Sequence, residues 1–283
     1  GRRGVRIAVV SDEISDDFEE AVQLGLLLGV DSYELRWVRP PTGLRRRRIG
    51  DVSEDDGVTL YNAAARQGAS ISAISPGLFY SRWDDLLQLQ TQMMRFEHAL
   101  RLAHALHARD IIIHGFMPPD GRRNGVCPAQ AIDALAHAAE RAKDEELRLL
   151  LRNTTGSYAD TAAHTASIVN AVRSDALAIS WDPCHAARAG DTVIGEAYEW
   201  VAPHVEDIRV KDQIQSDEHG YEYTVLAQGT IDWVAQLKIL TQGRYVGTMT
   251  LGAQTEPRLL STMHSLDALR KLLRKLQEGG SRL

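Results

Sequence analysis

Short apolar runs rich in β-branched residues alternate along the chain with longer stretches whose apolar positions recur at helical spacing. The run at residues 111–113 is entirely apolar, as expected of a strand buried on both faces. The pattern predicts eight strands, at residues 5–10, 32–38, 70–75, 111–113, 147–151, 177–180, 208–210 and 246–251. A helical stretch follows each strand, at residues 18–28, 58–67, 83–108, 128–142, 159–172, 194–201, 231–240 and 261–276.

This alternation predicts parallel strands joined by right-handed helical crossovers. Eight such units in 283 residues indicate an α/β fold of the (β/α)8 TIM-barrel type, with residues 1–283 as one domain and a C-terminal helix at about 261–276. A doubly wound open sheet is the alternative, but no G-x-G-x-x-G follows the first strand. Segment 39–56, which contains the arginine run 45–48, is predicted to be a solvated loop, with a phosphate-binding lid as the alternative.

Composition narrows the possible partners. The chain is 44% hydrophobic and 25% charged, which is typical of a soluble globular domain. Its formal net charge of −6 argues against a general nucleic-acid partner, and no apolar run reaches the ~18 residues that a membrane helix needs. The two cysteines, Cys127 and Cys184, form no disulfide framework, so we expect a reducing, cytoplasmic location.

Barrel active sites lie at the carboxyl ends of the strands, so the polar residues that end each predicted strand are the candidate site. In strand order they are Ser11, Asp12 and Glu13; Glu34 and Arg36; Ser75; His114; Arg152 and Asn153; Asp182, Cys184 and His185; Arg209, Lys211 and Asp212; and Thr250 and Gly252. Such a dense ring of ionisable groups is more than a purely structural barrel requires. The sequence therefore predicts a small-molecule site at this end.

Three motifs in this ring resemble one known family. Residues 181–185 (W-D-P-C-H) are similar to its D-P-x-H motif, residues 210–212 (V-K-D) to its H-V-K-D, and residues 228–233 (Q-G-T-I-D-W) to its G-x-G-x-I-D-W. The order and spacing of these motifs resemble the xylose-isomerase-like TIM-barrel superfamily along nearly the whole chain. That superfamily holds sugar-phosphate isomerases and epimerases, inosose dehydratases and an endonuclease branch.

The resemblance implies one divalent metal, held by Glu, Asp, His and Glu from strands five to eight. On this chain the first Glu position falls on Arg152, the Asp is kept as Asp182, the His position falls on Arg209, and the last Glu position falls near Gly252. Arginine stays protonated and has no lone pair for a metal, so we expect a degenerate site with no metal cofactor. One alternative ligand set remains open: Glu34, His114, Asp182 and His185.

Cationic side chains dominate the predicted mouth of the barrel. Arg152, Arg209, Arg36 and Lys211 would bind an anionic substrate, a carboxylate or a phosphate, in bidentate fashion. The alternative is an internal ion-pair network that leaves no free cation. Its expected pairs are Arg152 with Asp182, and Arg209 with Asp207 or Glu34.

Four residues are candidates for acid–base chemistry: Asp182, His185, Lys211 and Glu34. His185 resembles the family's substrate-binding histidine, and His114 is a candidate for substrate contact; either could instead be structural. A desolvated Lys211 would have a low pKa and act as a base or Schiff-base nucleophile, unless it pairs with a neighbouring acid. Glu34 is predicted to be a general base, or else an ion-pair partner of a mouth arginine.

These features predict an isomerase, epimerase or dehydratase-like lyase that acts without metal on a small polyhydroxylated or anionic, sugar-derived substrate. Arg152 and Arg209 would stabilise an enolate-like intermediate. Alternatives are a non-catalytic small-molecule-binding or partner protein on a metal-dead barrel, and a metal-dependent sugar isomerase with unusual ligands. A nuclease is disfavoured because the mouth lacks the His, Asp and Glu ligands of that branch. A homo-oligomer remains possible.

Overall fold

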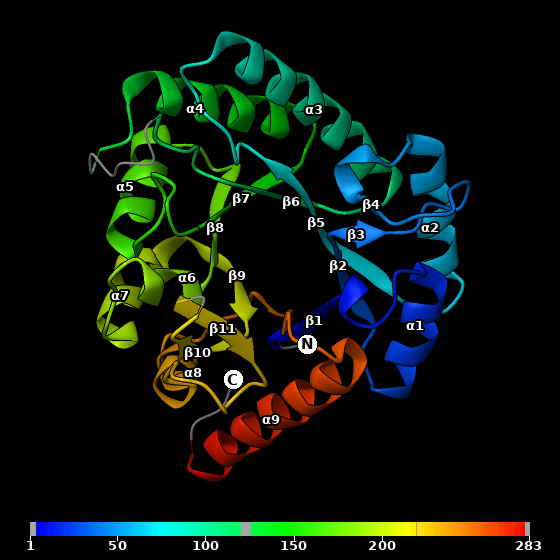
Figure 1. Ribbon diagram of the computed structural model, residues 1–283, viewed down its shortest axis with the longest axis vertical. Coiled ribbons are helices and arrows are strands. Elements are labelled where there is room, and N and C mark those ends of the chain that lie inside the picture. Colours follow the sequence, from blue (N-terminus) through cyan, green and yellow to red (C-terminus); the bar gives the residue numbers. More distant parts are fainter. Residues whose placement is uncertain (1–3, 120–125, 219, 281–283) are drawn as a thin grey trace.

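Eight parallel strands close into a barrel in the computed structural model, which describes residues 4–119, 126–218 and 220–280 (Figure 1). The strands are β1 (Arg6–Val10), β2 (Ser32–Leu35), β5 (Ser70–Leu78), β6 (Asp110–Ile113), β7 (Arg148–Arg152), β8 (Leu177–Trp181), β9 (Val205–Val210) and β12 (Thr248–Leu251). Strand β1 pairs with β2 on one side and with β12 on the other, so the sheet has no open edge. The predicted (β/α)8 barrel is confirmed, and the open sheet is excluded.

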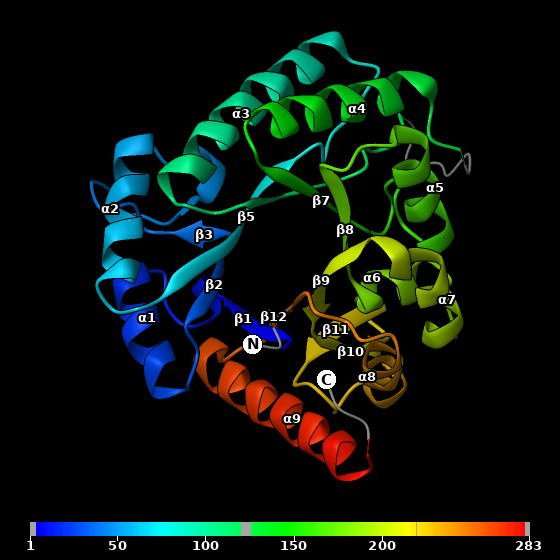
Figure 2. The same cartoon turned by 180° about the vertical axis from the view of Figure 1, so that it is seen from behind.

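Helices form a ring around the barrel, and Figure 2 shows the same ring from behind. In the described part of the chain they are α1 (Phe18–Leu27), α2 (Glu54–Ala65), α3 (Leu86–Ala105), α4 (Ala129–Asp144), α5 (Ala162–Val172), α6 (Pro183–Arg188), α7 (Ile194–Val201), α8 (Trp233–Gln242) and α9 (Arg258–Glu278). Helix α9 is the predicted C-terminal helix and begins directly after Pro257. Across the described ranges, no helix combines the length and apolarity needed to cross a membrane.

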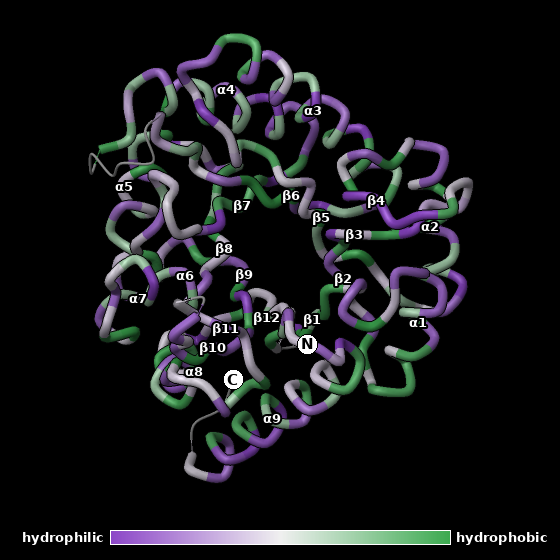
Figure 3. Tube along the Cα trace, in the orientation of Figure 1, coloured by the Kyte–Doolittle hydropathy of each residue, from purple (hydrophilic) through white to green (hydrophobic). Residues whose placement is uncertain are grey.

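Strand residues alternate between two apolar layers. Ile111, Ile113 and their neighbours on β7 belong to the large core between the strands and the helices. The inward positions form a separate small cluster inside the barrel: Ala73, Ile112, Leu150 and Ala178. Figure 3 shows the corresponding green of the strands and the alternating green and purple of the helices. Helices therefore cover the outer face, while the inner face depends on what each strand places there.

The same two-residue period carries polar side chains up the inside of the barrel. Two residues beyond the apolar cluster, β6 leads to His114, β7 ends in Arg152 and β8 carries Ser180. Because side chains alternate strictly along a strand, residues an even number of positions past the inward cluster face the barrel axis. The sheet register brings these positions to one level, with Arg152 paired to Ser180. A polar layer therefore lies directly on the apolar base.

Two short antiparallel ribbons extend beyond the barrel strands and were not predicted. Strands β3 (Trp37–Val38) and β4 (Arg47–Arg48) pair with each other, and β10 (Asp212–Ser216) pairs with β11 (Gly220–Thr224). The prediction of one strand over 32–38 is therefore wrong, because β2 ends at Leu35 and Trp37 turns to pair with Arg48. The predicted solvated loop at 39–56 is also wrong in part, since it contains β4 and the first residues of α2.

Candidate active site

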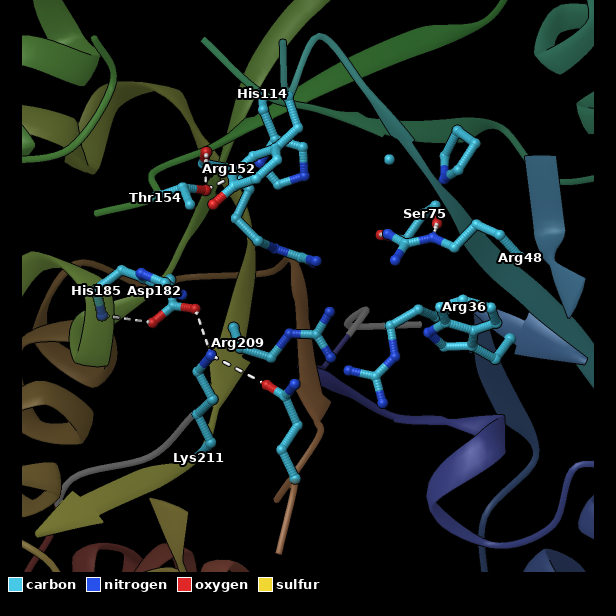
Figure 4. A pocket seen from close by; sticks show the side chains of 15 residues that line it. Arg36, Arg48, Ser75, His114, Arg152, Thr154, Asp182, His185, Arg209 and Lys211 are labelled. Carbon is cyan, nitrogen blue, oxygen red and sulfur yellow. Dashed lines mark hydrogen bonds and ion pairs between the residues drawn. The ribbon is translucent and has the colours of Figure 1, made fainter. Parts of the chain in front are cut away.

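A cavity of about 560 Å³ opens at the carboxyl ends of the barrel strands (Figure 4). Five cationic side chains and one carboxylate line it: Arg36, Arg48, Arg152, Arg209, Lys211 and Asp182. His114 and His185 complete the candidate chemistry of the lining. The cavity thus lies where the polar residues at the strand ends predicted a site. Of the eight predicted site residues, only Glu34 is absent from the lining.

Glu34 lies beneath the cavity floor, with only 1% of its surface exposed. Arg152 Nη2 donates to its Oε1 at 2.8 Å, and Arg209 Nη2 donates to its Oε2. Burial alone would raise the pKa of Glu34, but the two guanidinium groups outweigh it and lower that pKa to about 2. The predicted general-base role therefore does not fit, because both oxygens of this buried carboxylate are bound by guanidinium groups and Glu34 does not line the cavity.

Arg152 has further partners on the inward face. Its Nε donates to Ser180 Oγ at 3.1 Å, and its Nη2 lies 3.5 Å from Asp207 Oδ2. Ser180 in turn donates to the same Asp207 oxygen at 2.6 Å. The expected pair of Arg152 with Asp182 is wrong, whereas the alternative pair of Arg209 with Glu34 is confirmed.

Arg36 is held by a separate acidic pair. Its guanidinium binds Asp12 at 2.7 Å and Glu13 at 2.9 Å, both on the turn that follows β1. Burial raises the pKa of Glu13, although Arg36 opposes that rise. The alternative interpretation of Glu34, as the ion-pair partner of Arg36 or another mouth arginine, is confirmed for Arg152 and Arg209.

Asp182 and Lys211 form an ion pair across the ends of β8 and β9. Lys211 Nζ lies 3.0 Å from Asp182 Oδ2, and it also donates to Tyr223 OH at 3.1 Å and Gln254 Oε1 at 3.3 Å. Burial would lower the pKa of Lys211, but Asp182 outweighs it and the pKa is raised. The predicted low pKa of Lys211 is therefore wrong, and the side chain is an ammonium group at neutral pH. The alternative prediction, that Lys211 pairs with a neighbouring acid, is confirmed by its ion pair with Asp182.

Asp182 has a second task, as the residue that begins helix α6. Its Oδ1 accepts a hydrogen bond from the backbone N–H of His185 at 3.0 Å. Burial by itself would raise the pKa of Asp182, but the charge of Lys211 and the contact with His185 outweigh burial and hold that pKa far below its usual range. The carboxylate therefore orients both of its neighbours and stays ionised.

We assign opposite tautomers to the two cavity histidines from their hydrogen-bond partners. The backbone N–H of Thr155 donates to His185 Nδ1 at 3.0 Å, so the proton of neutral His185 resides on Nε2. The Thr154 hydroxyl donates to the Arg152 carbonyl at 3.3 Å, so His114 Nδ1, 2.9 Å away, donates to that hydroxyl. His114 therefore carries its free lone pair on Nε2. Burial lowers both pKa values, to about 4 for His185 and about 3 for His114.

Arg48 is a cavity residue that the sequence analysis placed only in the segment 39–56, whose alternative was a phosphate-binding lid. The β3–β4 ribbon carries it over the cavity, where its Nε donates to the Ser75 carbonyl at 2.8 Å. Its guanidinium also lies 5.6 Å from the centre of the Trp37 ring. Strand alternation turns Arg48 towards the cavity and leaves Arg47 exposed. The signal was present in the arginine run, but only the pairing of β3 with β4 selects which arginine points inward.

Comparison with known proteins bears out the resemblance. Residues 21–275 match the family described as the xylose isomerase-like TIM barrel. The chain belongs to this family. No curated protein matches the chain significantly in sequence.

Solved structures of the same fold are similar to this chain over nearly its whole length. An L-ribulose 3-epimerase aligns with a TM-score of 0.76 at 17% identity, covering 98% of this chain and 97% of its own. A probable 3-DHS dehydratase, AsbF, from Bacillus anthracis aligns with a TM-score of 0.75 at 13% identity, covering 94% and 99%. A xylose isomerase-like TIM-barrel protein from Mycobacterium smegmatis, in complex with magnesium, aligns with a TM-score of 0.71 at 14% identity, covering 97% of this chain and 97% of its own.

The side chains at the family's four metal-ligand positions do not fit a divalent ion. Arg152 and Arg209 occupy two of these positions and form ion pairs with Glu34, and Asp182 forms an ion pair with Lys211. A Cβ atom built on Gly252 would lie 2.5 Å from Arg209 Nη1, so the guanidinium occupies the space that a ligand side chain at 252 would need. The described residues also offer no group of three or more His, Cys, Asp or Glu side chains suited to a metal. The alternative ligand set of Glu34, His114, Asp182 and His185 is therefore not among such groups in the described part of the chain.

Proposed function

We propose that the protein is an isomerase, epimerase or dehydratase-like enzyme that moves a proton on a small, polyhydroxylated, anionic substrate without a divalent metal. One observation carries this: Arg152 and Arg209 are locked on Glu34 at metal-ligand positions, while His114, His185 and the Lys211 ammonium still face the cavity. The epimerase and the probable dehydratase among the structural neighbours support the reaction class. Fold similarity alone leaves the substrate open.

The geometry supports a division of labour between the two imidazoles. His114 Nε2, the free lone pair, takes the proton from the carbon next to a carbonyl, and the electrons of the C–H bond become an enolate. His185 Nε2–H donates a hydrogen bond to the enolate oxygen, and the Lys211 ammonium does so by exchanging its hydrogen bond to Gln254 for one to that oxygen. When His114 keeps the abstracted proton and the Lys211 ammonium protonates the enolate carbon on its other face, the result is epimerisation. Transfer of the Lys211 proton to a leaving hydroxyl instead gives water and a dehydrated product.

Asp182 and Glu34 take positioning roles in this proposal. Asp182 orients Lys211 through its ion pair and His185 through helix α6. Glu34 fixes the two arginines, which face the substrate's negative charge with Arg36. Both carboxyl pKa values lie well below neutrality, so neither group is expected to take a proton at physiological pH.

The pH profile is expected to be broad. The neutral imidazoles of His114 and His185 persist down to about pH 4, since burial lowers their pKa values to about 3 and about 4. The ammonium of Lys211 persists above its ordinary range because Asp182 raises its pKa. We therefore expect kcat/KM on a non-titrating substrate to stay flat from about pH 5 to pH 9. An acidic limb near pH 6.5, the ordinary histidine value, would contradict the assigned tautomers and burial.

Metal independence is tested by elemental analysis together with a proton-exchange assay. Wild-type protein purified without chelator is compared with Asp182→Ala, and both are incubated in D2O with a panel of keto sugars, sugar acids and sugar phosphates. We expect no stoichiometric metal, and solvent deuterium entering one substrate at a rate that EDTA leaves unchanged. One equivalent of Mn, Co, Zn or Mg that is absent from Asp182→Ala would overturn the metal-free proposal. Binding without exchange across the panel would favour a non-catalytic binding protein.

A further inference from the structure

Arg48 differs from the other cavity cations in having no carboxylate partner among the described residues. Arg152 and Arg209 share Glu34, and Arg152 also lies near Asp207. Arg36 pairs with Asp12 and Glu13, and Lys211 pairs with Asp182. Arg48 donates only to Ser75, and the described ranges place no carboxylate within ion-pair distance of it. Burial and the charge of Arg36 lower its pKa to about 10, so it remains charged at neutral pH. Arg48 therefore brings to the cavity lining a positive charge that no described carboxylate pairs directly.

Arg209 has an unused donor beside the same cavity. The residue is 3% exposed, and its Nη1 is buried against Gly252 without a hydrogen-bond partner among the residues described. The missing side chain at Gly252 leaves room for this nitrogen. Burial and the charge of Arg152 lower the pKa of Arg209, which marks a positive charge that Glu34 alone does not satisfy. A buried donor without a partner is costly unless a ligand supplies the acceptor.

Figure 4 shows the guanidinium groups of Arg36, Arg48, Arg152 and Arg209 converging on a common space, from the β3–β4 ribbon on one side and the barrel strands on the other. We infer that this space, between Arg48 and Arg209, binds an oxyanion of the substrate, a carboxylate or a phosphate. The anion pairs with Arg48, which has no carboxylate partner among the described residues, and lies beside the guanidinium of Arg209. Fork-shaped guanidinium groups suit both anions, and neither alcohol nor ketone oxygens would neutralise the charge.

This oxyanion seat rests on the proposed function and adds a consequence to it. The charges of Arg152 and Arg48 are among the causes that depress the pKa of His114. A bound anion offsets those charges, so binding should raise the pKa of His114 and make it a better base. The anionic group would thus serve recognition and activate proton transfer at the same time.

The test compares two neighbouring arginines of β4. Arg48→Gln removes the unpaired cavity charge, and Arg47→Gln removes an equal charge from the exposed face of the same strand. Binding of inorganic phosphate, glycerate and uncharged glycerol is measured by titration calorimetry on wild type and both variants. Arg48→Lys tests whether the planar fork matters beyond its charge. Thermal unfolding of each variant verifies that the barrel is intact.

We expect phosphate or glycerate to bind wild type and Arg47→Gln equally, and Arg48→Gln about 10–100-fold more weakly, as for a lost hydrogen bond to a charged group. Arg48→Lys should fall between them, and glycerol should show no dependence on Arg48. The stronger of the two anions identifies the substrate's acidic group. Equal anion binding by Arg48→Gln and wild type, or no anion binding by wild type, would overturn the inference.

The two proposals can fail separately, because this assay requires no turnover. Anion binding that depends on Arg48, without proton exchange on any panel substrate, would defeat the proposed enzyme and keep the oxyanion seat. Proton exchange on a neutral sugar, without anion binding that depends on Arg48, would keep the proposed enzyme and defeat the oxyanion seat.

Discussion

Replacing Glu34 with glutamine is expected to lower the free energy of unfolding by about 3–5 kcal/mol, the usual cost of removing one partner from a buried ion pair. Glutamine has the same shape, but its amide can accept from only one guanidinium and presents N–H groups to the other. Arg152 would keep Asp207 at 3.5 Å, whereas Arg209 would lose its one ion-pair partner among the described residues. The measurement is urea unfolding of wild type and Glu34→Gln.

The matched control for this loss is Glu206→Gln, which removes a carboxylate that is 43% exposed and 3.5 Å from Arg148. We expect that variant to change stability by less than about 0.5 kcal/mol. The double variant Glu34→Gln with Arg209→Met removes both charges, so it should recover part of the loss. Equal effects of Glu34→Gln and Glu206→Gln would show that the buried cluster is not what stabilises the barrel mouth.

The stability of the protein in acid is a second measure of the ion pairs that Glu34 makes with Arg152 and Arg209. The pKa of Glu34 is lowered to about 2, because Arg152 and Arg209 outweigh the effect of burial. A carboxyl pKa that is depressed on folding contributes stability above its unfolded value, near 4.3, and that stability disappears as the pH falls towards 2. Wild type should therefore lose stability steeply between about pH 4.5 and pH 2. Glu34→Gln should lose less over the same range.

The second large effect is expected on turnover. His185→Phe removes the Nε2–H donor, and Lys211→Met removes the ammonium beside Asp182, so each should lower kcat by about 10²–10⁴-fold. The effect should fall mainly on kcat, since both donors act on charge that develops in the transition state. The measurement is steady-state kinetics on the substrate that the exchange assay identifies.

Two variants separate this role from a merely structural one. Lys238→Met removes a lysine from an exposed position on α8 and should leave kcat unchanged. His185→Gln offers an amide N–H in place of the imidazole Nε2–H, so it should retain more activity than His185→Phe if the histidine acts as a hydrogen-bond donor. Loss of kcat in proportion to lost thermal stability in both His185 variants would argue for a structural histidine.

The arginines at the family's metal-ligand positions form one interdependent set with Gly252 and Glu34. Arg209 extends into space that Gly252 leaves open, and Glu34 binds both Arg209 and Arg152 from below. Each of these residues is needed for the others: a side chain at 252 would displace Arg209, and Arg209 without Glu34 would be buried with no counter-charge. This mutual dependence is the structural reason to expect metal-free chemistry here.

The alternation of apolar strands and amphipathic helices determined the barrel, because the two periods, 2 and 3.6, are local properties of consecutive residues. The same locality determined that Arg152, Asp182, Arg209 and Lys211 would end strands and face one cavity. The missing metal ligands could also be read from the sequence, since arginine cannot donate a lone pair wherever it lies.

Only the tertiary structure decided which charges pair. Glu34 is 118 residues from Arg152 and 175 from Arg209, so barrel closure and register, not sequence spacing, bring them together. The β3–β4 pairing likewise turned Arg48, and not Arg47, into the cavity. Proton positions on His114 and His185 followed from Thr154 and Thr155 beside them. Composition and strand order thus fix which groups reach the site, but ionisation and partner choice depend on distances of a few ångströms between distant segments.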